Sequence, residues 1–389
     1  MKLFAEIFFF VCAYAMLHTY ILYPATMLLF AWGKKNKNKE LFTNEELPEI
    51  TIICAAYNEE KVIEEKIRST FKTNYPGQKI TFLIGSDNCS DRTVEIIKKL
   101  QNEFTGLKLV EFTSRTGKIG IINALVAEVK TSIIVMTDAN VYFNPATLFE
   151  LVKHFKNNTT GMVCGNIIKK PLNSAAVTQS ELSYMNFENK LKYAESINFG
   201  IVVGAEGGCY AVRKEILKEI PVRFIADDFF ITCLVLQSKK NIVFEKEALA
   251  NEELLADTSR EFRRKARIAT GNFQNLFYFS RIVLRLWTIT SFCFISHKVF
   301  RWKTPFYFIT CFIISILLFK VHLIFQITFF GQVALLVLPF LNALLTGIGI
   351  KIKPLISLSH FMMMNAALLI GFIRFCKGVK SSVWEPVKR

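Results

Sequence analysis

A short apolar segment of the chain ends directly in a carboxylate. Residues 133–137 read Ile-Ile-Val-Met-Thr, and Asp138 and Asn140 follow at once. This run predicts a buried strand, and open α/β sheets bind their ligands outside the carboxyl ends of the strands. Carboxylate and amide oxygens at that place suit a hard divalent cation and the phosphates bridged to it. A second interpretation is that Asp138 only caps the loop after the strand.

Similar polar clusters follow other predicted elements. Strands are predicted over residues 50–54, 80–85, 107–112 and 133–137, and the helices between them end near residues 71, 102 and 129. Tyr57-Asn58-Glu59 follows the first strand, Ser86-Asp87 follows the second and Arg115-Thr116-Gly117-Lys118 follows the third. Because strands alternate with helices, we expect a parallel sheet covered on both faces. The clusters should therefore meet at one edge of the sheet.

The composition indicates a protein embedded in a membrane. Hydrophobic residues make up 52% of the 389 residues and are clustered. The apolar stretch from Leu3 to Trp32 predicts a retained transmembrane helix. Lys34 and Lys35 follow it and place the next part of the chain on the cytoplasmic side. Further apolar stretches, at about 305–325, 327–350 and 355–373, predict membrane segments in the C-terminal part.

The positive charge fits a membrane surface better than a nucleic acid. The net charge is +16, yet no acidic residue occurs between Glu261 and Glu385, and Lys and Arg recur at the edges of apolar runs. Arg281 and Arg285, four residues apart, give residues 276–302 the pattern of an interfacial helix. Three spans after a cytoplasmic domain would put the basic tail outside, so the number of C-terminal spans stays open. Nine cysteines without a CxxC pair predict reduced thiols.

Taken in order, these motifs resemble the family 2 glycosyltransferases, and in particular the membrane-bound branch with cellulose, chitin and hyaluronan synthases. The resemblance covers residues 48–275. It implies an α/β, GT-A-like nucleotide-sugar-binding domain with a mostly parallel sheet, flanked by transmembrane helices. The expected parts are a transmembrane helix (1–33), a cytoplasmic glycosyltransferase domain (34–275), an interfacial amphipathic helix (276–303), C-terminal transmembrane helices (304–376) and a basic tail (377–389).

The resemblance also implies residues that bind a nucleotide-sugar donor. Asp87 matches the carboxylate that reads the uracil or ribose, and Lys118 matches the lysine that meets the diphosphate. The full donor set is Tyr57, Glu59, Asp87, Lys118, Asp138, Arg264 and Arg267. For Lys118 the alternative is a solvated helix start, and for Arg263 and Lys265 it is a basic patch that faces the membrane.

Metal and catalytic roles follow from the same resemblance. Asp138-Ala139-Asn140 occupies the Asp-x-Asp position of the family, with an amide in place of the second acid, and implies Mg²⁺ or Mn²⁺ held by Asp138 and Asn140. Asp228 matches the catalytic base of inverting transfer, which takes the proton of the attacking hydroxyl. Asp227 is expected to cap the helix that begins there.

The acceptor segment and the basic signature after it follow the family pattern except at two positions. Glu206-Gly207-Gly208-Cys209 stands where the family lines its acceptor site, although the glycines could equally serve a turn. Arg264 and Ile268 stand where the family has Gln and Trp. In processive synthases that Trp stacks on the growing polymer, and Ile cannot stack in this way.

The resulting hypothesis is an inverting, metal-dependent, multi-pass glycosyltransferase of the cytoplasmic membrane, with its catalytic domain in the cytosol. It uses a nucleotide sugar, UDP-linked by resemblance, and a lipid-linked or membrane-adjacent glycan acceptor in polysaccharide biosynthesis. Its partners are the donor, the acceptor and the bilayer, and not nucleic acid. The alternatives are a processive synthase that extrudes its product, for which a homodimer could supply a wider path, and a non-catalytic nucleotide-binding scaffold. A transporter is disfavoured because the apolar segments contain few polar residues.

Overall fold

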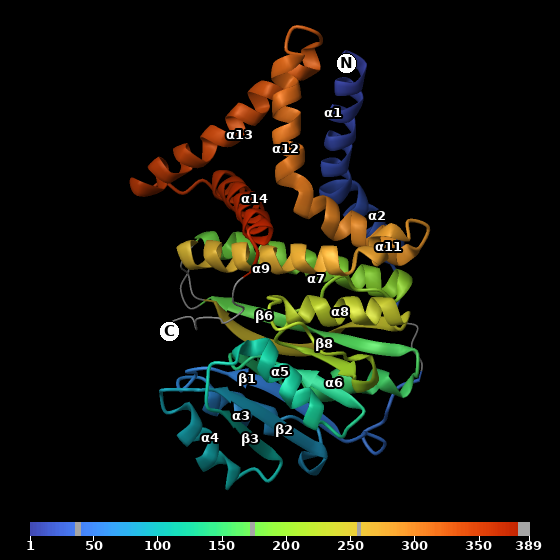
Figure 1. The fold of residues 1–389 in the computed structure, drawn as a ribbon, viewed down its shortest axis with the longest axis vertical. Coiled ribbons are helices and arrows are strands. Elements are labelled where there is room, and N and C mark those ends of the chain that lie inside the picture. Colours follow the sequence, from blue (N-terminus) through green and yellow to red (C-terminus); the bar gives the residue numbers. More distant parts are fainter. Residues whose placement is uncertain (36–39, 172–175, 255–257, 380–389) are drawn as a thin grey trace. The chain divides into compact units, whose positions relative to one another are not determined.

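The computed structural model describes residues 1–35, 40–171, 176–254 and 258–379, and these form two compact units. The sheet unit contains all the strands and the helices α3–α6 and α8, and the helical unit contains α1, α2 and α9–α14. Helix α7 (Ala176–Phe199) belongs to the helical unit up to Leu191 and to the sheet unit from Lys192. Figure 1 shows the course of the chain through both units.

The sheet unit is built on one eight-stranded sheet with the order β3-β2-β1-β4-β7-β6-β8-β5. The strands are β1 (Ile50–Ala56), β2 (Ile80–Asp87), β3 (Leu107–Phe112), β4 (Ile133–Met136), β5 (Val141–Phe143), β6 (Thr160–Pro171), β7 (Tyr210–Arg213) and β8 (Asn241–Leu254). Strands β3, β2, β1 and β4 are parallel, as the alternating pattern predicted. Strand β7 is antiparallel to both β4 and β6, whereas β6 and β8 are parallel.

Helices cover both faces of this sheet. The helices of this unit are α3 (Ile63–Phe71), α4 (Thr93–Gln101), α5 (Gly117–Glu128), α6 (Thr147–Val152) and α8 (Asp227–Ser238). Side chains of α3, α4 and α6 pack with Ile50, Ile52 and Cys54 in one hydrophobic core. Helix α5 lies on the opposite face, so close to β2 that a Cβ at Gly85 would come within 2.3 Å of Ile121. The parallel half therefore places the carboxyl ends of β1, β2 and β4 along one edge.

The helical unit consists of long helices and two π-helical turns. Its elements are α1 (Lys2–Leu17), η1 (His18–Leu22), α2 (Tyr23–Ala31), α9 (Thr258–Tyr278), α10 (Ser280–Leu284), α11 (Ile289–Phe294), η5 (Ile295–Val299), α12 (Phe300–Leu317), α13 (Leu323–Gly347) and α14 (Lys353–Cys376). Helix α1 packs on α12 through a small apolar cluster that includes Phe9, Cys12 and Cys311. In Figure 1, α1 and α12 run side by side.

Three helices among the described residues are long and apolar enough to cross a membrane. They are Lys2–Ala31, which joins α1, η1 and α2, and the C-terminal helices Leu323–Gly347 and Lys353–Cys376. The predicted basic tail begins at residue 377, and residues 380–389 of it lie outside the described residues, as do Lys37 and Lys39.

Two details of the predicted organisation differ from the structure. Residues 276–303 do not form one amphipathic helix, because α9 extends to Tyr278 and α10 and α11 are separate helices. Thr288 has an extended backbone, and its hydroxyl accepts a hydrogen bond from the Ser291 amide at 3.2 Å, so a new helix starts there. Helix α9 also belongs to the helical unit, although the predicted catalytic domain extended to residue 275. The nine cysteines are all free, as predicted.

Candidate functional site

The ends of three elements of the sheet unit converge on one charged cluster. Asp138 follows β4, Lys118 lies in the first turn of α5, and Asp227 and Asp228 begin α8. The Lys118 Nζ atom lies 3.0 Å from Asp138 Oδ1 and 3.3 Å from Asp227 Oδ1. Two helix N-termini, which favour negative charge, thus meet at the carboxyl end of a central strand. We name Lys118, Asp138, Asp227 and Asp228 the acid-rich cluster.

The acid-rich cluster has more carboxylates than cations, and this imbalance perturbs its protonation. Burial raises the pKa of Asp228 to about 7, and the neighbouring Asp227 adds to the effect. Burial alone would lower the pKa of Lys118, but Asp138, Asp227 and Asp228 outweigh it and raise that pKa. The lysine therefore stays charged. Perturbed groups of this kind, gathered in one place, are typical of functional sites.

Asp87, at the end of β2, supports the cluster through the turn before α5. Its fully buried carboxylate accepts hydrogen bonds from the Thr116 amide at 2.6 Å and the Gly117 amide at 3.2 Å, and it pairs with Arg115 Nε at 3.1 Å. Gly117 has a φ of +80°, which favours glycine over residues with a side chain. Asp87 therefore holds the turn that comes directly before Lys118. The predicted contact of Asp87 with uracil or ribose stays a prediction.

The predicted nucleotide motif after β1 is connected to this turn. The Arg115 guanidinium lies 3.2 Å from the centre of the Tyr57 ring. Asn58 has a left-handed backbone, with a φ of 52°, and its side-chain oxygen accepts the Ser90 amide at 2.9 Å. The Glu59 amide donates to the Thr93 hydroxyl at 2.8 Å. The loops after β1, β2 and β3 are thus joined into one surface by side-chain contacts.

The predicted acceptor segment lies directly beside Asp228. A Cβ at Gly207 would lie 3.2 Å from Asp228 Oδ2, so only a residue without a side chain fits easily there. Glu206 pairs with Lys192 at 2.9 Å. Cys209 belongs to the hydrophobic core, and burial raises the pKa of its thiol to about 12. An acceptor contact at this segment would therefore come from Glu206 and the glycine backbone.

The oxygen atoms of the acid-rich cluster fit a divalent cation that is shared with a substrate phosphate. Asp138, with 38% of its side chain exposed, is the accessible carboxylate. The Asn140 amide instead donates to Glu252 Oε1 on β8 at 3.2 Å. In the part of the chain that the structure describes, no group of three or more His, Cys, Asp or Glu side chains could hold a metal alone. However, enzymes that act on phosphates usually bind magnesium with only one or two carboxylates, and the oxygens of the substrate phosphate supply further ligands.

The two arginines predicted to meet the donor belong to α9 of the helical unit. Arg264 pairs with Glu261 at 2.9 Å and with Glu181 at 3.4 Å. Arg267 has an exposed side chain. Their donor contacts stay predictions.

Sequence reasoning missed one buried lysine next to the cluster. Lys66 of α3 is fully buried, and its Nζ donates to the Thr137 hydroxyl at 2.7 Å and to the Val141 carbonyl at 2.6 Å. Thr137 in turn donates to the Gly208 carbonyl at 2.9 Å. Lys66 therefore connects the Asp138 loop with the predicted acceptor segment. A signal was present, because Lys66 lies on the same helix stripe as the buried Ile63.

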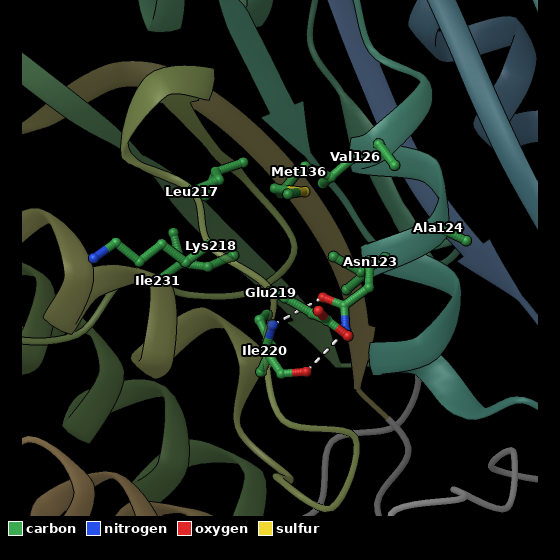
Figure 2. A pocket seen from close by; sticks show the side chains of 11 residues that line it. Asn123, Ala124, Val126, Met136, Leu217, Lys218, Glu219, Ile220 and Ile231 are labelled. Atoms are coloured by element: carbon green, nitrogen blue, oxygen red, sulfur yellow. Dashed lines mark hydrogen bonds between the residues drawn. The ribbon is translucent and has the colours of Figure 1, made fainter.

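A pocket of about 450 Å³ lies between α5, the end of β4 and α8. Its lining is mostly apolar and includes Val126, Met136 and Ile231 (Figure 2). Asn123 of α5 holds the loop before α8 by donating to the Ile220 carbonyl at 2.8 Å and accepting the Ile220 amide at 3.0 Å. Because that loop leads into Asp227, the pairing links α5 to the start of α8.

Comparisons with known proteins bear on the family and the fold of the chain. Residues 51–221 match the family model of glycosyl transferase family 2. The chain carries a family 2 glycosyl transferase domain. A mannosyltransferase from Pyrobaculum calidifontis, solved with GDP-Man and Mn²⁺, is 20% identical and has a TM-score of 0.71, covering 96% of this chain and 99% of that one. This likeness confirms the predicted GT-A-like fold.

Three curated relatives are named as a glycosyltransferase, a glycolipid synthase and a polysaccharide synthase. A probable glycosyltransferase, YdaM of Bacillus subtilis, is 23% identical over 58% of this chain. A beta-monoglucosyldiacylglycerol synthase of Trichormus variabilis is 24% identical over 61%, and a poly-beta-1,6-N-acetyl-D-glucosamine synthase of Staphylococcus epidermidis is 22% identical over 58%. The chain spans 56%, 52% and 55% of these relatives, about half of their length.

Proposed function

We propose that the chain is an inverting glycosyltransferase. It moves a sugar from a nucleoside diphosphate to a hydroxyl of a lipid-linked or membrane-adjacent glycan, in the synthesis of polysaccharides or glycolipids. The observation that carries the proposal is the lysine between carboxylates: Lys118 lies within 3.3 Å of Asp138 and Asp227, with Asp228 in the same cluster. A cation and several acids at strand ends suit a leaving diphosphate and a proton-accepting base.

The proposed reaction is a single displacement at the anomeric carbon. The acceptor oxygen forms a bond to that carbon, its proton passes to Asp228, and the bond between the carbon and the diphosphate oxygen breaks with both electrons on the diphosphate. Lys118 stabilises the added negative charge on the leaving group. Asp228, with a pKa raised to about 7, is still largely ionised just above neutral pH and is a stronger base than an ordinary aspartate.

A divalent cation, Mg²⁺ or Mn²⁺, is proposed as cofactor. Asp138 would hold it, with Asn140 as the second predicted ligand, and when bound it would neutralise the departing diphosphate. The support comes from the exposed Asp138 carboxylate and from the Mn²⁺ bound by the Pyrobaculum calidifontis enzyme. Asn140 can serve only if its amide leaves Glu252 or presents its oxygen toward the loop.

The proposal has two versions, which differ in the nucleobase of the sugar donor. The family motifs predict a uridine nucleotide read by Tyr57, Glu59 and Asp87, whereas the Pyrobaculum calidifontis enzyme binds GDP-Man. We propose UDP, because Tyr57, Glu59 and Asp87 stand at the positions for which the resemblance implies contacts with a uridine nucleotide. Arg264 and Arg267 stay predicted donor contacts.

The acceptor is proposed to be held at the membrane surface. Glu206 and the glycines beside Asp228 are the proposed acceptor contacts, with Cys209 contributing through its backbone. The three apolar helices support a multi-pass protein, and Lys34 and Lys35 after the first one support a cytosolic sheet unit. A homodimer is compatible with this scheme and is not required by it.

A panel experiment tests the proposal. Membranes that carry the protein are incubated with UDP-glucose, UDP-N-acetylglucosamine and GDP-mannose, and nucleotide release is measured with and without extracted lipid and with EDTA. We expect release with a UDP-sugar that depends on lipid and on divalent metal. Activity that survives EDTA would contradict the metal-binding role of Asp138. Donor binding without nucleotide release, for every donor, would favour the non-catalytic scaffold.

Processive synthesis is tested at position 268. Ile268 replaces the tryptophan expected of processive enzymes, so we propose transfer of one or a few sugars. Ile268→Trp is expected to lengthen the product, which gel or mass analysis measures, while the initial rate changes little. Long polymer from the unaltered protein would instead support a processive synthase.

A further inference from the structure

Tyr210, which no sequence motif singled out, lies opposite the end of β4, the strand that leads to Asp138. It is the first residue of β7 and pairs with Met136 of β4 and Cys164 of β6. Residues directly opposite in a ladder project to the same face of the sheet. Tyr210 therefore shares the face of Met136, which Figure 2 shows beside α5 and which also borders α8. This is the face on which Lys118 and the acid pair begin their helices.

The hydroxyl of Tyr210 is an exception among buried tyrosines. The side chain is completely buried, and its oxygen makes no hydrogen bond to any described residue. Tyr75 provides the contrast in the same unit, because it is also buried and its hydroxyl donates to the Pro48 carbonyl at 2.5 Å. Buried tyrosines usually find such a partner, and an isolated buried polar group requires a specific explanation.

The surroundings of this hydroxyl are acidic. Burial raises the pKa of Tyr210 well above its usual value, and the carboxylates of Asp227, Asp228 and Asp138 raise it further, in that order. The phenol therefore keeps its proton and can donate a hydrogen bond. After burial, Asp227 has the largest influence on this pKa among the three carboxylates. In the resting structure Asp227 is already neutralised by Lys118 at 3.3 Å.

We propose that Tyr210 is a positioning residue for the acid pair, and that its hydroxyl donates a hydrogen bond to Asp227 once Lys118 has moved to the donor diphosphate. The inference rests on the proposed transferase function, which assigns Lys118 to the diphosphate. Without a replacement donor, Asp227 would be left as an uncompensated charge next to the base Asp228. The bond from Tyr210 would hold Asp227 in place and keep Asp228 oriented toward the acceptor hydroxyl. Tyr210 would thus act through Asp227 and not on the substrate.

The test compares Tyr210→Phe with Tyr75→Phe in the full-length protein. A hydrogen bond to a charged group predicts that Tyr210→Phe lowers kcat about 10- to 100-fold, with donor KM within about twofold and Tm unchanged or raised. Tyr75→Phe should do the reverse and lower Tm without changing kcat. Unchanged kcat in Tyr210→Phe would overturn the inference, as would a loss confined to donor KM.

A double mutant shows whether Tyr210 acts through Asp227. In an Asp227→Ala background, Tyr210→Phe should have little further effect on kcat, because the acceptor of the bond has been removed. Equal fold-losses in both backgrounds would contradict the inference. Tyr210→Met is a second variant, which removes the ring as well as the hydroxyl. If Tyr210→Met lowers kcat and Tyr210→Phe does not, the effect comes from the packing of the ring and the inference fails. If the unaltered protein transfers no sugar from any donor, the proposed function itself fails; if it transfers and Tyr210→Phe matches it, only this inference fails.

Discussion

Two clusters of charged side chains, one in each unit, have opposite compositions. The acid-rich cluster of the sheet unit places one cation, Lys118, among the carboxylates of Asp138, Asp227 and Asp228. In the helical unit, Glu188 of α7 is surrounded by basic groups. It pairs with His297 Nε2 at 2.9 Å, with Lys298 and with Arg301 Nη1 at 2.7 Å. We name Glu188 and these three partners the base-rich cluster.

The two clusters respond to burial in opposite ways. Burial alone would raise the pKa of Glu188, but Lys298, His297 and Arg301 hold it well below its usual range. The pKa of Asp228 rises to about 7 because burial and Asp227 act together. A single acid with several cationic partners is firmly satisfied, as expected for a buried structural network. Several acids around one lysine leave negative charge that a ligand cation or a proton can neutralise, which is the arrangement suited to a reaction.

Removal of the base from the acid-rich cluster should have the largest effect. Asp228→Asn keeps the size of the side chain but cannot take a proton, so we expect transfer to fall about 100- to 10,000-fold. UDP binding, measured by calorimetry, should stay within about twofold of the unaltered protein. Loss of binding and transfer together would mean that Asp228 has a structural role, like Glu188.

Removal of the acid from the base-rich cluster should instead affect stability. Glu188→Gln leaves buried cations without their counter-charge, so we expect a loss of about 3–5 kcal/mol in the free energy of unfolding. Thermal unfolding in detergent measures it. Glu64→Gln, which breaks an exposed helix pair with Arg68, is the control and should cost less than about 1 kcal/mol. An unchanged melting temperature in Glu188→Gln would contradict the structural reading of this cluster.

Lys66 tests whether the acid-rich cluster depends on a second, fully buried cation. Lys66→Met removes the donor to Thr137 and Val141 while keeping the length of the side chain. We expect the Asp138 loop to loosen, and the metal concentration for half-maximal activity to rise about 10- to 100-fold, the equivalent of one charged hydrogen bond. Lys79→Met is the matched control, because Lys79 donates at 2.6 Å to the Leu47 carbonyl in the same unit. Equal responses of the two variants would exclude a specific role for Lys66.

The pH dependence of activity and of Tm should show the smallest effect. It further distinguishes the acid-rich cluster from the base-rich cluster. Because Asp228 must be ionised to act as a base, activity should fall about tenfold per pH unit below about 7. The folded-state pKa lies above the ordinary value of 3.8, so the stability that protonated Asp228 contributes is lost as the pH rises through 7. Asp228→Asn should therefore raise Tm more at pH 8 than at pH 5, because part of that stability is already lost once the pH exceeds the ordinary pKa of 3.8. An equal change at both values would show that Asp228 is ionised throughout.

Much of the first half of the fold could be predicted from the sequence. Strands β1 to β4 are apolar runs that end in polar turns, and both their positions and their parallel order follow from that local pattern. A short strand before Arg213 was predicted and is β7, but its antiparallel pairing was not, and neither were β5, β6 and β8, because β6 pairs with β8 across a long helix. Such pairing depends on contacts between distant residues, which short motifs do not encode.

The site shows the same division. The acids at strand ends and Lys118 were recognisable because their types and spacing carry the signal. Lys66 acts on Thr137 from 71 residues away, and Tyr210 matters only because it is buried beside carboxylates from other elements. Their importance arises from burial and proximity in the folded chain, and neither can be read from neighbouring residues.

The ion pairs of Lys118 have a thermodynamic consequence for the order of events. In the resting protein this lysine is an internal counter-ion of Asp138, and a metal must compete with it for that carboxylate. A diphosphate that draws Lys118 away would lower this competition, so the nucleotide should tighten metal binding, and the metal should tighten nucleotide binding by the same factor. The two ligands would then load as a cooperative pair, and the free protein would be insensitive to metal until a sugar donor is present.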